Sequence, residues 1–364
     1  MTSIQGTDWI KKISNPIQVG GIETAVLDNG PGRGTRVAWV NTGAGLRYKV
    51  VIDRGLDIAD AQYRENGLAW ISHAGITAPS QHPYRGVEWL NGFGGGLMTT
   101  CGLDHSGGPE SDEAGDRGLH SQYSGIPATI ESIIQPDPAC GRMDMQITGT
   151  VKQSQALGTK LTLRRTISSR LGEPAIRIDD EVINSGNTPA PHMLLYHMNF
   201  GWPLVDEGVD ICWNGAWTSR EGDDKAKIFR KGQPFKKGKS PLEDHVGGGE
   251  EAAFVDITPD MDGNCHCGIH NPRLGIALAL SFSKSQFPWM TNWQHWGPGE
   301  YVLGLEPGTH PPIGQAQARK DGTLIMLQPS ERRRYSVTVK VYDQPADIKQ
   351  FLRQTGMAAE IENQ

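Results

Sequence analysis

Alternation of apolar and polar residues with a period of two is the most constraining pattern in this chain. It runs through residues 143–151, 176–182 and 336–341, where Met, Ile or Val alternates with polar and charged residues. This spacing places the apolar side chains on one face of a β-strand and the polar ones on the other. Strands with one buried face are typical of antiparallel sheets, because the strands of a parallel α/β sheet are buried on both faces.

The composition agrees with many short strands joined by tight turns. Of 364 residues, 46 are Gly and 23 are Pro, and turn signals separate the apolar stretches at 28–32, 185–187 and 320–322. Long amphipathic helical patterns are scarce. We therefore predict an all-β fold built from a large antiparallel β-sandwich with few short helices.

The chain reads as one domain spanning residues 1–364. We expect N-terminal strands or an arm over 1–45, and a long loop or excursion over 219–252, which is charged, Gly-rich and without clear periodicity. The one persuasive helix falls at 345–356, where three apolar residues share one side and Gly356 suits the position after the last turn.

Charge and hydropathy exclude several classes of protein. The formal net charge is -6, and the basic run at 332–334 precedes a strand, so we expect no nucleic-acid partner. The longest apolar run, 274–280, is too short to span a membrane, and the first residues lack the apolar core of a secretion signal. Five cysteines, an odd number, favour reduced thiols in a cytoplasmic protein. A homodimer is compatible with the sequence, which does not fix the oligomeric state.

Two histidines and one glutamate have the chemistry of an acid/base site. His120, His197 and Glu306 each lie in a short ordered stretch beside a turn, and the stretches around His197 and Glu306 are strongly apolar. Burying an unsatisfied polar group costs about 1–3 kcal/mol, so His197 needs a partner or a role. Desolvation raises the pKa of a carboxyl group and improves it as a base near neutral pH. A structural histidine and an ion-paired strand-end glutamate remain the alternatives.

His192 and His197 are five residues apart on the same predicted strand. Their side chains should therefore face opposite sides of the sheet. We expect only one of the two to face the site.

Aromatic residues gather near these candidates, which favours a carbohydrate ligand. Trp202 follows His197, and three tryptophans, Trp293 among them, precede Glu306. Aromatic rings stack on the apolar faces of sugars while polar groups bind the hydroxyls. Asp104 and His105 form a polar pair in a Gly-rich loop and are further candidates for lining a pocket.

Two other motifs carry less weight. Cys265, His266, Cys267 and His270 could bind a metal, but their spacing does not match a structural zinc site. The glycines of 92–96 lack the GK[ST] of a phosphate-binding loop. We predict neither a zinc site nor a phosphate cradle there.

Taken together, these motifs resemble the aldose 1-epimerase (galactose mutarotase-like) superfamily, and more closely its DUF4432 branch. The resemblance covers residues 51–341 and implies a twisted β-supersandwich with a sugar site on a concave sheet face. The segments that carry it are DRGLDI at 53–58, GGGLMTTCGL at 94–103, GLH at 118–120, HMNFG at 197–201 and GLEP at 304–307.

The resemblance also implies roles for individual residues. His197 matches the general acid that protonates the ring oxygen, Glu306 the general base at the anomeric hydroxyl, and His120 the histidine that binds near the ring oxygen. The Asp that holds sugar hydroxyls in typical galactose mutarotases has no clear equivalent, and Asp104 and Asp206 are the candidates. The predicted substrate-binding residues are Arg54, Arg85, Asp104, His105, Asn199, Trp202 and Trp293.

The sequence thus predicts a carbohydrate-active isomerase, an aldose 1-epimerase that interconverts the anomers of a free or modified sugar. Neither a metal nor an organic cofactor is expected, because both steps are proton transfers at oxygen. One alternative is a metal-dependent sugar isomerase in which His120, His197 and Glu306 hold a divalent ion. The other is a non-catalytic carbohydrate-binding protein, since a fold does not fix a function.

Overall fold

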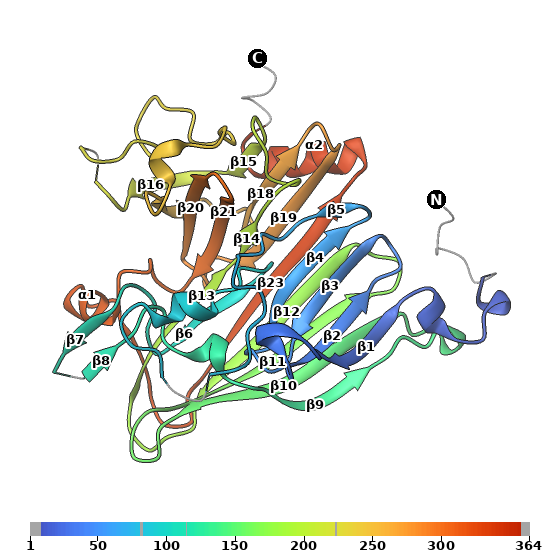
Figure 1. Ribbon diagram of the computed structural model, residues 1–364, viewed down its shortest axis with the longest axis horizontal. Coiled ribbons are helices and arrows are strands. Elements are labelled where there is room, and N and C mark those ends of the chain that lie inside the picture. The colour runs from blue at the N-terminus through green and yellow to red at the C-terminus, as the bar shows by residue number, and fades with distance from the viewer. Residues whose placement is uncertain (1–8, 81–82, 114, 223, 358–364) are drawn as a thin grey trace.

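The computed structural model describes residues 9–80, 83–113, 115–222 and 224–357. Its largest element is an eight-stranded antiparallel sheet, ordered β15-β18-β19-β23-β12-β11-β10-β9 (Figure 1). The predicted strands at 143–151, 176–182 and 336–341 all lie in this sheet, in β10, β12 and β23. Its strands are β9 (Thr129–Ile134), β10 (Asp144–Ser154), β11 (Lys160–Arg170), β12 (Ala175–Asn184), β15 (Asp210–Trp213), β18 (Asn264–Asn271), β19 (Ile276–Ser283) and β23 (Arg332–Tyr342).

A second sheet packs against the first and carries His197, Asn199, Trp293 and Glu306 among the site candidates. Its strand order is β16-β17-β20-β21-β13-β22, and two further strands join it, β6 on β13 and β14 on β21. Its strands are β6 (Thr99–Leu103), β13 (Ala190–His197), β14 (Asn199–Phe200), β16 (Gly215–Ser219), β17 (Glu251–Ile257), β20 (Trp289–Gly297), β21 (Glu300–Gly308) and β22 (Ile325–Leu327).

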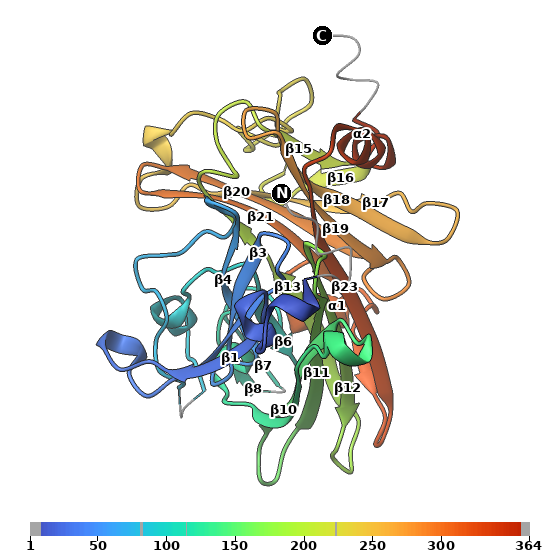
Figure 2. The same cartoon turned by 90° about the vertical axis from the view of Figure 1, so that its right-hand side faces the viewer.

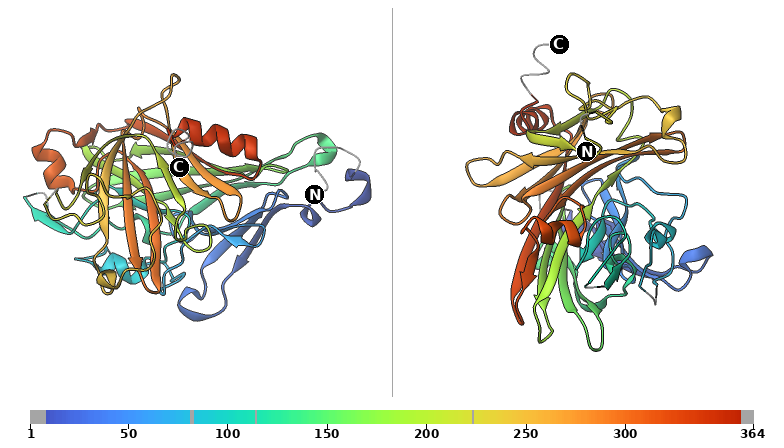
Figure 3. Two further views of the ribbon diagram at one scale, coloured as in Figure 1. Left: turned by 90° about the horizontal axis from the view of Figure 1, so that it is seen from above. Right: turned by 90° about the vertical axis from the view of Figure 1, so that its left-hand side faces the viewer.

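The N-terminal part forms a separate five-stranded sheet in the order β1-β2-β3-β4-β5. Figure 3 shows this sheet, in blue, on one side of the long green strands. Two short strands, β7 (Glu110–Asp112) and β8 (Gly115–Arg117), pair with each other. The strands of the N-terminal sheet are β1 (Gly21–Val26), β2 (Arg36–Asn41), β3 (Leu46–Val51), β4 (Asp57–Tyr63) and β5 (Asn66–Gly67).

Two α-helices accompany the sheets, α1 (Gln315–Lys320) and α2 (Pro345–Gln354). The second lies in the segment where the sequence predicts a helix, and it packs outside the large sheet near β15 and β18 (Figure 2). It buries Ile348, Phe351 and Leu352. Gly356 follows with φ 72°, the left-handed conformation that commonly ends a helix.

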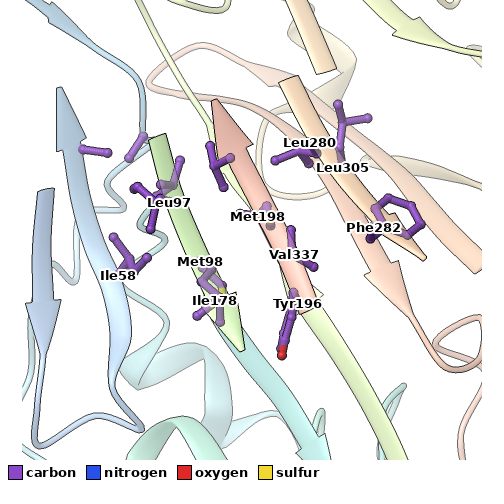
Figure 4. Packing of buried hydrophobic residues seen from close by; sticks show 14 of the residues in the cluster. Ile58, Leu97, Met98, Ile178, Tyr196, Met198, Leu280, Phe282, Leu305 and Val337 are labelled. Atoms are coloured by element: carbon purple, nitrogen blue, oxygen red, sulfur yellow. The ribbon is translucent and has the colours of Figure 1, made fainter. Parts of the chain in front are cut away.

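The main core fills the space between the sheets (Figure 4). Ile178 and Val337 reach it from the large sheet, and Leu305 and Met198 reach it from the second sheet. Each such side chain, fully buried, contributes about 1.5–3 kcal/mol relative to an exposed one. Because side chains alternate along a strand, the neighbours of Leu305 on β21 point to the opposite face of the second sheet.

A buried ionic network joins the sheets beneath that face. The guanidinium of Arg165 on β11 is fully buried and bonds Asp180 on β12 at 2.7 Å and Asp57 on β4 at 3.0 Å. Asp57 in turn accepts hydrogen bonds from the amide and hydroxyl of Thr100 on β6. The Tyr196 hydroxyl on β13 donates to Asp180 at 2.5 Å. The network therefore ties β13 and β6 to the layers behind them.

All five cysteines are free thiols. In the part of the chain that the structure describes, no helix has the length and apolar character needed to cross a membrane.

Candidate active site

A cavity of about 390 Å³ lies against the second sheet and brings together His120, His197 and Glu306. His197 is the last residue of β13, and Glu306 lies on β21 one residue beyond the core residue Leu305. His120 comes from the loop after β8. The three residues that the sequence singled out thus converge from distant parts of the chain.

His197 and Glu306 form a buried pair. Nδ1 of His197 lies 3.3 Å from Oε1 of Glu306, and neither atom makes a hydrogen bond within the structure. The side chains are 8% and 3% exposed. Since a buried polar atom is normally hydrogen-bonded, the two atoms are available to bond each other or a ligand.

Burial sets the protonation of the pair. Desolvation raises the pKa of Glu306 well above its usual value, and the positive charge of Arg220 only partly opposes this. Desolvation lowers the pKa of His197 to about 4, although a hydrogen bond with Asn199 acts in the other direction. Both shifts favour the neutral forms of the two groups, a protonated carboxyl group on Glu306 and a neutral imidazole on His197.

Gly304 makes room for this carboxyl group. A Cβ atom at Gly304 would lie 2.4 Å from Oε1 of Glu306 and 3.1 Å from Cβ of Trp293. The residue precedes Glu306 by two on β21, so it shares the same face of the sheet. Only glycine leaves both side chains where they are.

We therefore expect Gly304→Ala to displace the Glu306 carboxyl group and to lower the rate of any reaction in which that group takes part by about 10²-fold, because a shift of about 1 Å is enough for such a loss. Steady-state kinetics and the thermal midpoint would be measured together. Gly299→Ala is the control at a turn glycine with open space around it. A Gly304→Ala variant with unchanged activity would show that activity does not depend on the present position of the Glu306 carboxyl group.

His120 is held in a strained backbone conformation with φ 55°. Its Nδ1 accepts a hydrogen bond from the Gly107 amide at 3.3 Å, so the ring of the neutral tautomer carries its proton on Nε2. Desolvation, followed by the positive charges that His197 and His105 would carry, lowers the pKa of His120 well below its usual value. His120 is therefore a neutral hydrogen-bond donor rather than a cation.

Aromatic rings surround His197. The ring of Trp293 lies 5.2 Å from that of His197 in an edge-on arrangement, and Phe93 lies at 5.0 Å. Trp89 stacks on Phe93 at 4.3 Å and meets His120 edge-on at 4.8 Å. Trp293 was predicted from the sequence, whereas Trp89 and Phe93 were not. Trp89 lies in the short 3-10 helix η4 (Glu88–Gly92) and Phe93 directly follows it.

The segment 220–250 contributes charged residues to the pocket. Arg220 and Glu250 both line it, and Nη2 of Arg220 donates to the Glu250 carbonyl at 2.9 Å. Nε of Arg220 donates to Glu221 at 2.6 Å. Among its described residues this segment holds the 3-10 helix η7 (Glu243–His245) but no strand beyond an isolated bridge. The sequence predicts a long loop here, and the pocket residues Arg220 and Glu250 were not among its predicted site residues.

Three predicted binding residues lie away from this pocket. The guanidinium of Arg54 is buried and donates to the carbonyl oxygens of Ser124, Thr77 and Gly92, on a separate cavity of about 310 Å³. Arg85 is exposed and lines another surface hollow. Trp202 is 71% exposed and does not line the pocket.

Three other predicted binding residues support the site rather than line it. Asp104 accepts hydrogen bonds at 2.6 Å from both Ser121 and Gln153. His105 is fully buried, and its Nε2 lies 2.9 Å from the Gly108 carbonyl. Asn199 donates to the carbonyl of His197 at 2.9 Å and so holds the end of β13.

His192 faces the opposite side of β13 from His197, as the five-residue spacing predicts. Its ring nitrogens lie 2.8 Å from the Leu103 carbonyl and 2.8 Å from the Tyr335 hydroxyl. It is therefore a satisfied core histidine.

The described residues contain no group of three or more His, Cys, Asp or Glu side chains placed to hold a metal ion. The ring of His120 lies 6.0 Å from that of His197, centroid to centroid. His197 and Glu306 are paired with each other, and His120 is not the third member of a compact ligand set.

A family model described as "Domain of unknown function (DUF4432)" matches residues 32–341. Among solved structures, one from Klebsiella pneumoniae described as a "putative aldose 1-epimerase" is 20% identical, with TM-score 0.82, covering 96% of this chain and 89% of that one. No curated protein matches the sequence.

Two more distant structures share the architecture. A galactose mutarotase-like protein from Clostridium acetobutylicum is 10% identical, with TM-score 0.58, and the match covers 89% of this chain and 98% of that one. A galactose 1-epimerase from Lactobacillus acidophilus is 12% identical, with TM-score 0.55, covering 88% and 98%. The predicted galactose mutarotase-like β-supersandwich is confirmed.

Proposed function

We propose that this chain, which belongs to the DUF4432 family, is an aldose 1-epimerase that interconverts the α and β anomers of a sugar. The observation that carries the proposal is the buried pair of His197 and Glu306, with Nδ1 and Oε1 3.3 Å apart in a pocket lined by aromatic rings. The fold that it shares with galactose mutarotase-like proteins supports the same conclusion.

The reaction needs a base and an acid that act together. Glu306 would take the proton from the anomeric hydroxyl while His197 gives a proton to the ring oxygen, and the bond between C1 and the ring oxygen breaks. Rotation about the C1–C2 bond and closure by the reverse transfers deliver the other anomer. Each positioned acid or base contributes about 10²–10⁴-fold to the rate.

One proton on the pair is enough for this chemistry. When the carboxyl group of Glu306 carries this proton, its transfer across the 3.3 Å to Nδ1 of His197 creates the carboxylate and imidazolium that the first step uses. The two forms are tautomers with the same total charge, so no proton need enter from water. The neutral His120, with its N–H on Nε2, would orient the sugar beside them.

The pocket suits a monosaccharide in size and lining. Its volume of about 390 Å³ is near the lower end of the roughly 300–1,000 Å³ common for small-molecule sites. The rings of Trp89, Phe93 and Trp293 offer apolar surface for the face of a sugar.

The pH dependence of the rate follows from the pair. Activity should be lost as the pH falls through about 4, because His197 then takes up a second proton and the pair has no base. It should also be lost as the pH rises above the elevated pKa of Glu306, because the pair then has no acid. Initial exchange rates across the pH range would show a broad plateau between these limits. A rate that rises continuously with pH would contradict a one-proton pair.

The proposal is tested by anomeric exchange in a panel of aldoses, uronates and sugar phosphates, followed by NMR with and without enzyme. Acceleration of at least one sugar is expected. Calorimetric binding of a sugar without acceleration of any exchange would instead indicate a carbohydrate-binding protein.

A further inference from the structure

Several buried polar atoms in this protein lack a hydrogen-bond partner, and half of them belong to the pocket. Eight such side-chain atoms occur among the described residues, and four lie on residues that line it: Trp89 Nε1, His197 Nδ1, Thr291 Oγ1 and Glu306 Oε1. More than about 90% of buried polar groups in folded proteins are paired. The gathering of unpaired atoms around one cavity indicates that a ligand supplies their partners.

Two of these four atoms have no part in proton transfer. Thr291 is 2% exposed and Trp89 is 2% exposed, so water does not replace the missing partners freely. The indole N–H can only donate a hydrogen bond, whereas the threonine hydroxyl can donate and accept. A donor and a group that both donates and accepts match the hydroxyl groups of a sugar.

Thr291 has a defined position relative to Glu306. The two residues are direct cross-strand partners on β20 and β21, so their side chains lie on the same face of the sheet. Cβ atoms of such partners are about 4.5–5.5 Å apart. If Glu306 meets the hydroxyl on C1, the Thr291 hydroxyl is next to it, within reach of the oxygen on the neighbouring carbon.

We infer that Thr291 and Trp89 bind substrate hydroxyls, and that Thr291 recognises the free hydroxyl on C2, beside the anomeric centre. The choice of C2 rests on the proposed function, because the reaction places C1 at Glu306. The substrate class is then the 2-hydroxyaldoses, and 2-deoxy and 2-acylamino sugars are poor ligands. Thr291 and Trp89 would thus bind the sugar hydroxyls, a role for which the sequence analysis had only Asp104 and Asp206 as candidates. Asp104 is bonded to Ser121 and Gln153, and Asp206 to Arg273.

The test compares binding of D-glucose, D-galactose and D-mannose with binding of their 2-deoxy analogues, by calorimetry and ligand-detected NMR. The wild type should prefer the best-bound parent sugar at least about tenfold, since a site built to hydrogen-bond a hydroxyl rejects an analogue that lacks it. Thr291→Val should lose most of this preference, and Thr291→Ser should keep it. Trp89→Phe, which retains a ring but not the N–H, should weaken binding of parent and analogue alike.

Stability separates a binding role from a structural one. Thr291→Val should leave the thermal midpoint of the free protein unchanged or higher, because it removes a buried hydroxyl that has no partner. Thr35→Val is the matched control, since Thr35 is also buried with an unpartnered hydroxyl but lies outside the pocket. Its effect on sugar binding should be negligible.

The outcomes distinguish this inference from the proposed function. An unchanged preference for the 2-hydroxyl in Thr291→Val, or a lower thermal midpoint with unchanged binding, would overturn the inference even if exchange is accelerated. A preference that depends on Thr291 in a protein that accelerates no exchange would sustain the inference and overturn the epimerase. Absence of both binding and acceleration for every sugar would overturn both.

Discussion

Replacing Glu306 by Gln is expected to lower kcat/KM for anomeric exchange by about 10²–10⁴-fold, the contribution of a positioned general base. Burial raises the pKa of Glu306 and so favours the neutral form of its carboxyl group. A neutral amide of the same shape should therefore leave the thermal midpoint unchanged or raise it. Exchange rates by NMR and thermal unfolding of the same preparations would check both parts.

Glu250→Gln makes the same chemical change at a more exposed carboxylate of the pocket. We expect it to change the rate less than about tenfold, because it removes an interaction at the pocket and not the base itself. Equal exchange rates in the wild type and in Glu306→Gln would remove Glu306 from the mechanism, whatever the control shows.

Replacing Arg165 by Met is expected to destabilise the protein by about 3–5 kcal/mol, the usual cost of removing one partner from a buried ion pair. Its guanidinium is fully buried against Asp180 and Asp57, which would be left without their cation. Denaturant unfolding would measure the loss. The same change at Arg177, whose side chain is 59% exposed beside Asp179, should cost no more than about 1 kcal/mol.

Removing the Arg165 guanidinium should also disturb the positions of residues in the candidate active site. Asp180 accepts the hydroxyl of Tyr196, which precedes His197 on β13, and Asp57 holds Thr100, the cross-strand partner of Tyr196. We expect the folded fraction of Arg165→Met to show a lower kcat. An Arg165→Met protein with wild-type stability would mean that the network is not needed to hold the sheets together.

The regular part of the fold could be predicted from the sequence because it depends on local pattern. Period-two alternation in β10, β12 and β23 follows from one buried face, and the pattern survives whatever the strand packs against. The pairing of strands could not be predicted in this way. β13 pairs with β6, about 90 residues earlier in the chain, and its partner is chosen by the packing of the whole sandwich.

The residues of the candidate site also differ in how far the local sequence reveals them. His120, His197 and Glu306 could be chosen because an ionisable residue in an apolar stretch is visible in one sequence. Arg54 was placed in the site by resemblance, but the structure shows its guanidinium bonded to three carbonyl oxygens elsewhere. Trp89 could not be predicted as a pocket residue, because an aromatic residue in a short 3-10 turn usually packs in the core.

The segment 220–250 places Arg220 and Glu250 on the pocket, while the strands β13 and β21 hold the reacting pair. The loop segment therefore lines the pocket without contributing either member of the buried pair. Under the proposed function, insertions or substitutions in the segment are expected to alter which sugars enter while leaving the strands that carry His197 and Glu306 in place, since loops tolerate sequence change better than packed strands do. Relatives that differ mainly in this segment would be expected to share one reaction and to differ in the sugars that they prefer.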